Sequence, residues 1–243
     1  MMTNFGLSLL LGLTAAAANV AGGVLIVQRH WKREVLKYFI ALGSGFMLAT
    51  AMLEMMPASL ELNPEWALPL VLAGYLLVHL FEHTIPAHFH FGEEVHPEEM
   101  VRPHVGYTAV FGLLIHAFFD GVAIASGFLV SAWLGTVIFL AVFLHKIPDG
   151  FTAASVMMAS GRGPRQAVGA AALMGASTIL GVGVMWLFQG QLLYGLSLSA
   201  GATLYVAASD LMPEVNREPG ILMAVWVFLG VVLMLGLHTL LHF

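Results

Sequence analysis

HAFFDG, from His116 to Gly121, and HKIPDG, from His145 to Gly150, are two copies of one pattern, in which His, an acid and Gly recur at the same spacing. Positions i and i+4 share a face of an α-helix, so each copy predicts a helix that projects one imidazole and one carboxylate together. Two such helices side by side would direct two imidazoles and two carboxylates at one point. That ligand set is typical of a divalent-cation site.

The chain around both copies is mostly apolar. Of its 243 residues, 59% are hydrophobic and 9% are charged, and the mean hydropathy is +0.89. A soluble domain carries about 25% charged residues, so this composition predicts a membrane protein with a single transmembrane domain over residues 1–243. The absence of Cys excludes disulfides, thiolate metal sites and cysteine nucleophiles. The net charge of −5 gives no sign of a nucleic-acid-binding surface.

Apolar stretches of spanning length divide the whole sequence. A membrane-spanning helix needs about 20 mostly apolar residues. The sequence therefore predicts an all-α polytopic membrane protein with eight transmembrane helices: Phe5–Gln28, Lys37–Pro57, Trp66–Ile85, Val105–Phe128, Ala132–Met158, Ala167–Phe188, Gln191–Met212 and Gly220–Leu241. The first span has no basic segment before it, and its charges follow it, which predicts a retained helix rather than a cleaved signal peptide.

The distribution of positive charge supports this count, because cytoplasmic loops of membrane proteins are enriched in Lys and Arg. With eight spans and both termini outside, the inner loops carry eight of the nine basic residues and the outer loops carry none. These eight are Arg29, Lys32, Arg33, Lys37, Arg102, Arg162, Arg165 and Arg217. The ninth, Lys146, lies within the fifth span. We therefore expect a multi-pass protein of the cell membrane, which in a bacterium is the inner membrane.

A His-rich loop at about 86–104 connects the third and fourth spans on the expected cytoplasmic side. Five of the 11 His residues lie between His83 and His104, together with several carboxylates. His and acid in one tract are typical of loose metal binding, so His88 and His90 are auxiliary candidates. A solvated acidic loop near lipid headgroups is the alternative interpretation.

Ionisable side chains are costly in the bilayer core, where they usually face a cavity or one another. Apart from Lys37 at the boundary of the second span, only a few lie in the expected spans or at their ends: Glu54, Glu82, Asp120, Lys146, Asp149, Asp210 and Glu214. Ordered by expected depth in the membrane, they run from Glu54 near the outer surface, through both motif copies at mid-depth, to Glu214 near the inner surface. This order predicts metal entry past Glu54 and exit past Asp210 and Glu214. Met47, in the second span, is a further candidate for a soft contact.

Each feature of the two motifs also has a purely structural interpretation. Each His–Asp pair could neutralise itself, and Pro148 could be a packing kink of the kind common in membrane helices. Repetition of the same pair at the same depth, followed each time by Gly, favours a shared metal site over two independent polar pairs.

These motifs resemble the ZIP family (Zrt-, Irt-like proteins) of divalent-metal transporters. The segment Gly201–Glu214, with Leu204-Tyr205-Val206 and Asp210-x-x-Pro213-Glu214, resembles a further family motif, and Gly45–Pro57 is a looser match. The resemblance covers the whole chain. It implies a ZIP-like helical bundle of eight spans with both termini outside and a His-rich inner loop.

The resemblance implies a midplane transport site between the fourth and fifth spans, often with two metal ions. Carried over by position, the primary ligands are His116, Asp120, His145 and Asp149. The second ion loses its ligands here: Ala117 replaces a common Asn, Lys146 replaces an acid, and the sixth span offers only Ser177 or Thr178 where Glu is common. We therefore expect one metal ion per site, with Lys146 as the substitute for the second charge.

The expected function is transport of Zn(II), or of Fe, Mn, Co or Cd, into the cytoplasm by alternating access, with the metal as substrate and without a cofactor. An intramembrane zinc-dependent hydrolase is the enzyme alternative, although the sequence has no H-E-x-x-H motif. A membrane receptor or scaffold, with structural His–Asp pairs, is a third class. The expected partners are the metal ion and the lipid bilayer, not nucleic acid. The sequence is compatible with a carrier or a channel-like mechanism, and with a monomer or a homodimer.

Overall fold

A computed structural model describes residues 3–28, 33–84 and 103–241, and within these ranges every regular element is helical. Most of the expected His-rich loop, with His88 and His90, lies outside the described residues. The elements are α1 (Asn4–Val27), α2 (Arg33–Thr50), η1 (Ala51–Met55), α3 (Met56–Leu62), α4 (Ala67–Thr84), α5 (Pro103–Val130), α6 (Ala132–Ala159), α7 (Pro164–Leu187), η2 (Gln189–Gln191), α8 (Leu192–Tyr205), η3 (Val206–Leu211), α9 (Met212–Arg217) and α10 (Ile221–Leu241).

Seven helical stretches in the described part of the chain are long and apolar enough to cross a membrane. They correspond to seven of the eight expected spans. The remaining one, the third in chain order, corresponds to α4, which is also helical but has a shorter apolar stretch, Ala67–Phe81. The prediction of an all-helical, multi-pass protein is therefore confirmed. The placement of the termini outside the cell stays a prediction.

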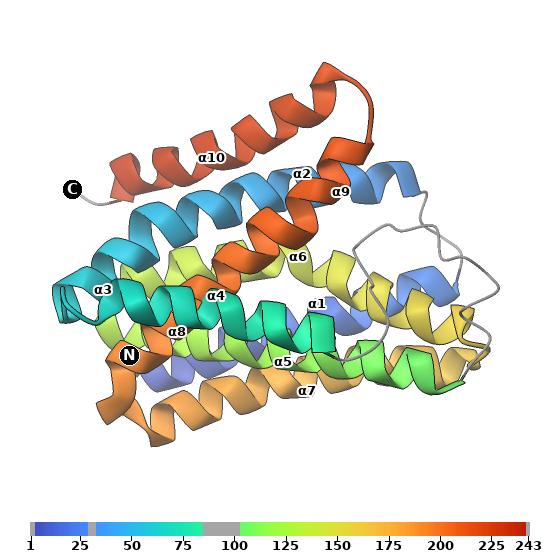
Figure 1. Cartoon of the computed structure of the whole chain (residues 1–243), viewed down its shortest axis with the longest axis horizontal. Helices are drawn as coiled ribbons and strands as arrows, with labels where there is room; N and C mark the ends of the chain where they lie inside the picture. Colours follow the sequence, from blue (N-terminus) through green and yellow to red (C-terminus); the bar gives the residue numbers. More distant parts are fainter. Residues whose placement is uncertain (1–2, 29–32, 85–102, 242–243) are drawn as a thin grey trace.

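The helices form one central bundle with flanking pairs (Figure 1). Helices α1, α5, α6 and α7 pack against one another as a four-helix bundle. Outside it, α2 packs with α10, and α4 packs with α8. The flanking pairs meet the bundle mainly where α2 contacts α6 and where α8 contacts α5. The two helices that carry the repeated motif therefore lie at the boundary between the bundle and its flanks.

The glycine that ends each motif is a point of close backbone approach. A Cβ atom on Gly121 would collide with the Thr178 carbonyl oxygen of α7, and one on Gly150 would collide with the Asn19 carbonyl oxygen of α1. Small residues allow membrane helices to approach this closely. Each motif therefore pairs a carboxylate with a packing contact that fixes the helix carrying it.

Two long helical rods contain a π-helical segment that the sequence analysis did not predict. The segments are η1, between α2 and α3, and η3, between α8 and α9. Each contains a buried acid, Glu54 or Asp210, three residues before a proline, Pro57 or Pro213. Proline has no N–H to donate to the carbonyl four residues earlier, so an α-helical ladder is interrupted there. π-segments of this kind occur frequently at functional sites.

Candidate metal centre

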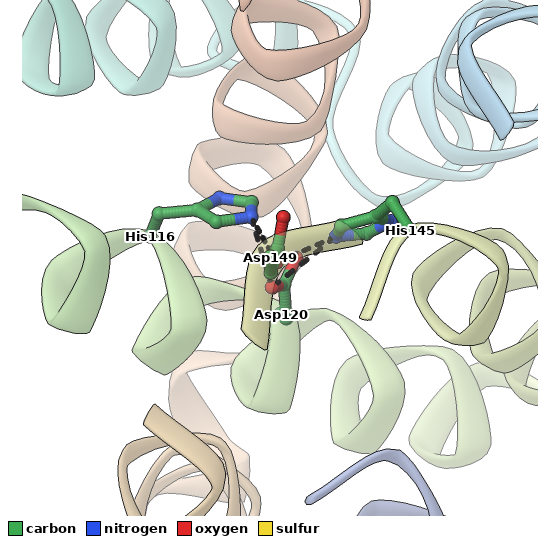
Figure 2. A group of neighbouring side chains, drawn as sticks. All are labelled: His116, Asp120, His145 and Asp149. Atoms are coloured by element: carbon green, nitrogen blue, oxygen red, sulfur yellow. Dashed lines mark ion pairs between the residues drawn. The ribbon is translucent and has the colours of Figure 1, made fainter. Parts of the chain in front are cut away.

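The structure brings the four primary candidates together. His116 and Asp120 project from α5, and His145 and Asp149 project from α6, as the i, i+4 spacing predicts. Figure 2 shows the two imidazoles approaching from opposite sides, with both carboxylates between them. Each residue offers one nitrogen or oxygen atom, and these four atoms lie within 4.8 Å of one another.

The distances between these atoms are close to those of a tetrahedral metal site. His116 Nε2 lies 3.2 Å from Asp120 Oδ2 and 3.5 Å from Asp149 Oδ2. His145 Nε2 lies 3.6 Å from the same oxygen of each carboxylate. Tetrahedral zinc with ligand bonds of about 2.0 Å separates neighbouring ligand atoms by about 3.3 Å. The four atoms therefore need only small shifts to surround one ion.

The His145 ring is held in one tautomer. Its Nδ1 lies 2.9 Å from the Ala141 carbonyl oxygen, which can only accept a hydrogen bond. Nδ1 therefore carries the proton, and the lone pair is on Nε2, the atom that faces the carboxylates. Orientation of a metal-binding imidazole through its other nitrogen is the usual arrangement in metal sites.

The cluster is closed to solvent and incompletely hydrogen-bonded. His116 is 5% exposed, and Asp120, His145 and Asp149 are 1% exposed or less. Among the described residues, His116 Nε2, His145 Nε2 and Asp149 Oδ1 have no hydrogen-bond partner. Buried polar atoms are costly when left without a partner. The two Nε2 atoms belong to the four-atom set, and their lack of a hydrogen-bond partner fits a bound cation.

Lys146 supplies a permanent positive charge within the cluster. Its fully buried ammonium contacts Asp120 Oδ2 closely and Asp149 Oδ2 at 3.1 Å. These are the same oxygen atoms that face the two imidazoles. With neutral imidazoles, two carboxylates and one ammonium leave a net charge of −1, so the buried acids are only partly compensated.

The comparisons with known proteins agree with this geometry. The sequence matches the ZIP Zinc transporter family over residues 92–238, which is more than half of the chain and includes every residue of the cluster. The chain belongs to the ZIP family.

Two curated relatives show how far the similarity extends. The zinc transporter ZupT of Salmonella newport is 28% identical over 225 residues, which cover 84% of this chain and 85% of that protein. The human zinc transporter SLC39A7 is 27% identical over 136 residues, which cover 51% of this chain but only 29% of that longer protein. Because the family consists of transporters, the hydrolase alternative is not supported.

The positions that the family resemblance associates with a second metal ion hold no His, Asp or Glu in this chain. Ala117 is fully buried. On α7, the Ser177 hydroxyl donates to the Leu114 carbonyl at 2.7 Å, and the Thr178 hydroxyl donates to the Met174 carbonyl at 3.3 Å. Among the described residues, Lys146 is the only Lys or Arg that contacts the Asp120 and Asp149 carboxylates.

The auxiliary candidates lie outside the four-residue cluster. Met47 is fully buried in an apolar cluster with Ala141 and Leu211. Asp210 is buried in η3, and Glu214 lies 3.5 Å from Arg217. Glu54 lies 2.6 Å from His238, which is in the last turn of α10. No local spacing could reveal this last contact, because 184 residues separate the two side chains.

Proposed function

We propose that this ZIP protein carries a divalent metal ion, with Zn(II) as its substrate, across the membrane and into the cytoplasm. The central observation is the set of four buried nitrogen and oxygen atoms within 4.8 Å of one another on adjacent helices. Two imidazoles and two carboxylates suit zinc, and also Fe(II), Mn(II), Co(II) and Cd(II). The word zinc in the names of ZupT and SLC39A7 supports the choice of Zn(II).

The ion binds singly, to His116, Asp120, His145 and Asp149. Lys146 takes the place of a second cation, because its ammonium contacts the two carboxylates that a second ion would share. The ammonium also limits how tightly the site holds zinc. The loaded cluster has a net charge of +1 and the empty cluster −1, so neither state buries a large uncompensated charge.

The two-part architecture supports alternating access as the mechanism. The bundle of α1, α5, α6 and α7 carries the site as a unit, and the flanking helices form its surroundings. Glu54 lies on the entry side, and Asp210 and Glu214 lie on the exit side towards the cytoplasm. His88 and His90 then receive the ion at the inner loop. The protein resides in the cell membrane, which in a bacterium is the inner membrane, as a monomer or homodimer.

Zinc flux into proteoliposomes that contain a trapped metal-sensitive dye tests this function. We expect saturable flux from the wild type and none from Asp149→Ala. The matched control is Glu65→Gln, which changes an exposed carboxylate in the turn before α4. Wild-type flux no greater than that of protein-free vesicles would refute transport. Equal flux in the wild type and Asp149→Ala would refute the proposed site.

A further inference from the structure

Glu54 and His238 meet where two helical rods that are distant in the sequence lie side by side. Glu54 Oε1, in the π-helical segment η1, lies 2.6 Å from His238 Nδ1 in the last turn of α10. The Trp133 ring, at the start of α6, packs edge-on to the imidazole at a centroid distance of 6.4 Å. The pair therefore lies at the end of the molecule where α10 ends and α6 begins (Figure 1).

The two partners differ in their access to solvent. The Glu54 side chain is 7% exposed, whereas the His238 side chain is 44% exposed. The carboxylate of the pair is therefore buried behind an imidazole that is half-exposed to solvent. Since a carboxylate and an imidazole are both zinc ligands, the pair presents an oxygen and a nitrogen to an ion arriving from that end.

The pair can open to admit an ion with little movement. Zinc bound to both Glu54 Oε1 and His238 Nδ1 would hold these atoms about 3.3 Å apart. The present separation is 2.6 Å, so an outward shift of a fraction of an ångström by the half-exposed imidazole is sufficient. Water completes the coordination on the exposed side, which makes such a site weaker and faster to exchange than a site with four protein ligands.

This pair is separate from the His–Asp cluster. Along α6, Trp133 precedes His145 by 12 residues, or about 18 Å at 1.5 Å per residue. The buried side chains of Val137, Ala141 and Met47 pack together in this interval. No ligand of the deeper cluster can therefore reach an ion at Glu54 and His238.

We propose that Glu54 and His238 form a second, low-affinity site for a divalent cation, which captures the ion before it reaches the deeper cluster. The capture role rests on the proposed transport function, whereas binding at the pair does not. Charge supports the assignment, because a carboxylate attracts cations and Glu54 contacts an imidazole, itself a zinc ligand type, whereas both carboxylates of the deeper cluster contact the Lys146 ammonium.

Equilibrium binding of Zn(II) to the full-length protein in detergent tests the site directly, in an Asp149→Ala background that disables the deeper cluster. We expect weakly bound ions both at this pair and at the inner-loop His88 and His90. Addition of His238→Ala or Glu54→Gln should weaken the component at the pair by about tenfold or more, while Glu65→Gln should not. Size-exclusion elution and thermal unfolding would establish that each variant is folded. Residual binding that is unchanged in both folded variants would overturn the proposal and leave the pair as a structural contact between η1 and α10.

Flux measurements separate this proposal from the proposed function. In the otherwise wild-type chain, His238→Ala should raise the KM for zinc about three- to tenfold and change the maximal rate by less than about twofold. An unchanged KM would refute the capture role. If the wild type shows no flux, transport fails, but the binding measurement still decides whether Glu54 and His238 hold an ion.

Discussion

The His–Asp cluster of α5 and α6 and the Glu54–His238 pair use the same ligand types but are built differently. The cluster is fully enclosed, and each of its two His–Asp pairs lies within about one turn of a single helix. The pair is half-exposed and joins segments 184 residues apart. A local, enclosed site can be held rigidly by its own helices, whereas the pair depends on how α10 packs against α2.

The charged groups around the cluster and around the Glu54–His238 pair also differ. In the cluster, both carboxylates contact the Lys146 ammonium, and the net charge is already reduced before any ion arrives. Glu54 contacts an imidazole instead. Removing water from an ion is costly, so a deep site needs several ligands at defined positions, while an accessible site can retain water around its ion. This difference predicts unequal effects of the same substitutions at the two places.

Replacing one histidine in each place by alanine should give the largest contrast. His145→Ala removes a buried imidazole, a proposed metal ligand whose tautomer is fixed by the Ala141 carbonyl, and it should lower zinc flux by about 100-fold or more. His238→Ala should change only the KM. Initial rates at a series of zinc concentrations measure both effects. Comparable losses of maximal rate in the two variants would contradict the assignment of transport to the enclosed cluster.

The next largest effect is expected from substitution of Lys146, and it concerns the number of zinc ions bound per chain. Lys146→Asp replaces the ammonium with a third carboxylate beside Asp120 and Asp149, and calorimetric titration should show one additional zinc ion per chain. Lys146→Met is the matched control, because it removes the charge without adding a ligand and should show no additional ion. If the Asp variant folds and also binds no additional ion, Lys146 does not occupy the place of a second metal.

Gly150 tests whether the cluster depends on helix packing. Gly150→Ala would place a methyl group against the Asn19 backbone and should destabilise the protein by about 1–3 kcal/mol. Gly112→Ala is the control, because an added Cβ on Gly112 of α5 has no heavy atom of another described segment within 4 Å, and the change should be neutral or slightly stabilising. Thermal unfolding in detergent, with and without zinc, compares them. Equal unfolding temperatures for the two variants would show that the close contact with α1 is dispensable.

The contrast between the two places also explains what the sequence could predict. The cluster was predictable because a spacing of four residues fixes a shared helix face, and because the motif is repeated. The spans were predictable from continuous apolar stretches. Glu54 was singled out as an ionisable residue of a span, but its contact with His238 could not be predicted, since that contact depends on tertiary packing. The π-segments were also missed, although the acid-x-x-Pro spacing at Glu54–Pro57 and Asp210–Pro213 marks both of them.

Ser177 should give the smallest effect and bears on the single-ion interpretation. Its hydroxyl donates to the Leu114 carbonyl, which orients the side chain towards α5. Ser177→Ala removes one hydrogen bond, should cost about 1 kcal/mol of stability, and should leave zinc flux and stoichiometry unchanged. Flux assays and calorimetry with this variant measure both quantities. A loss of bound zinc would mean that α7 contributes a ligand after all, and the cluster would then extend beyond α5 and α6 to a third helix of the bundle.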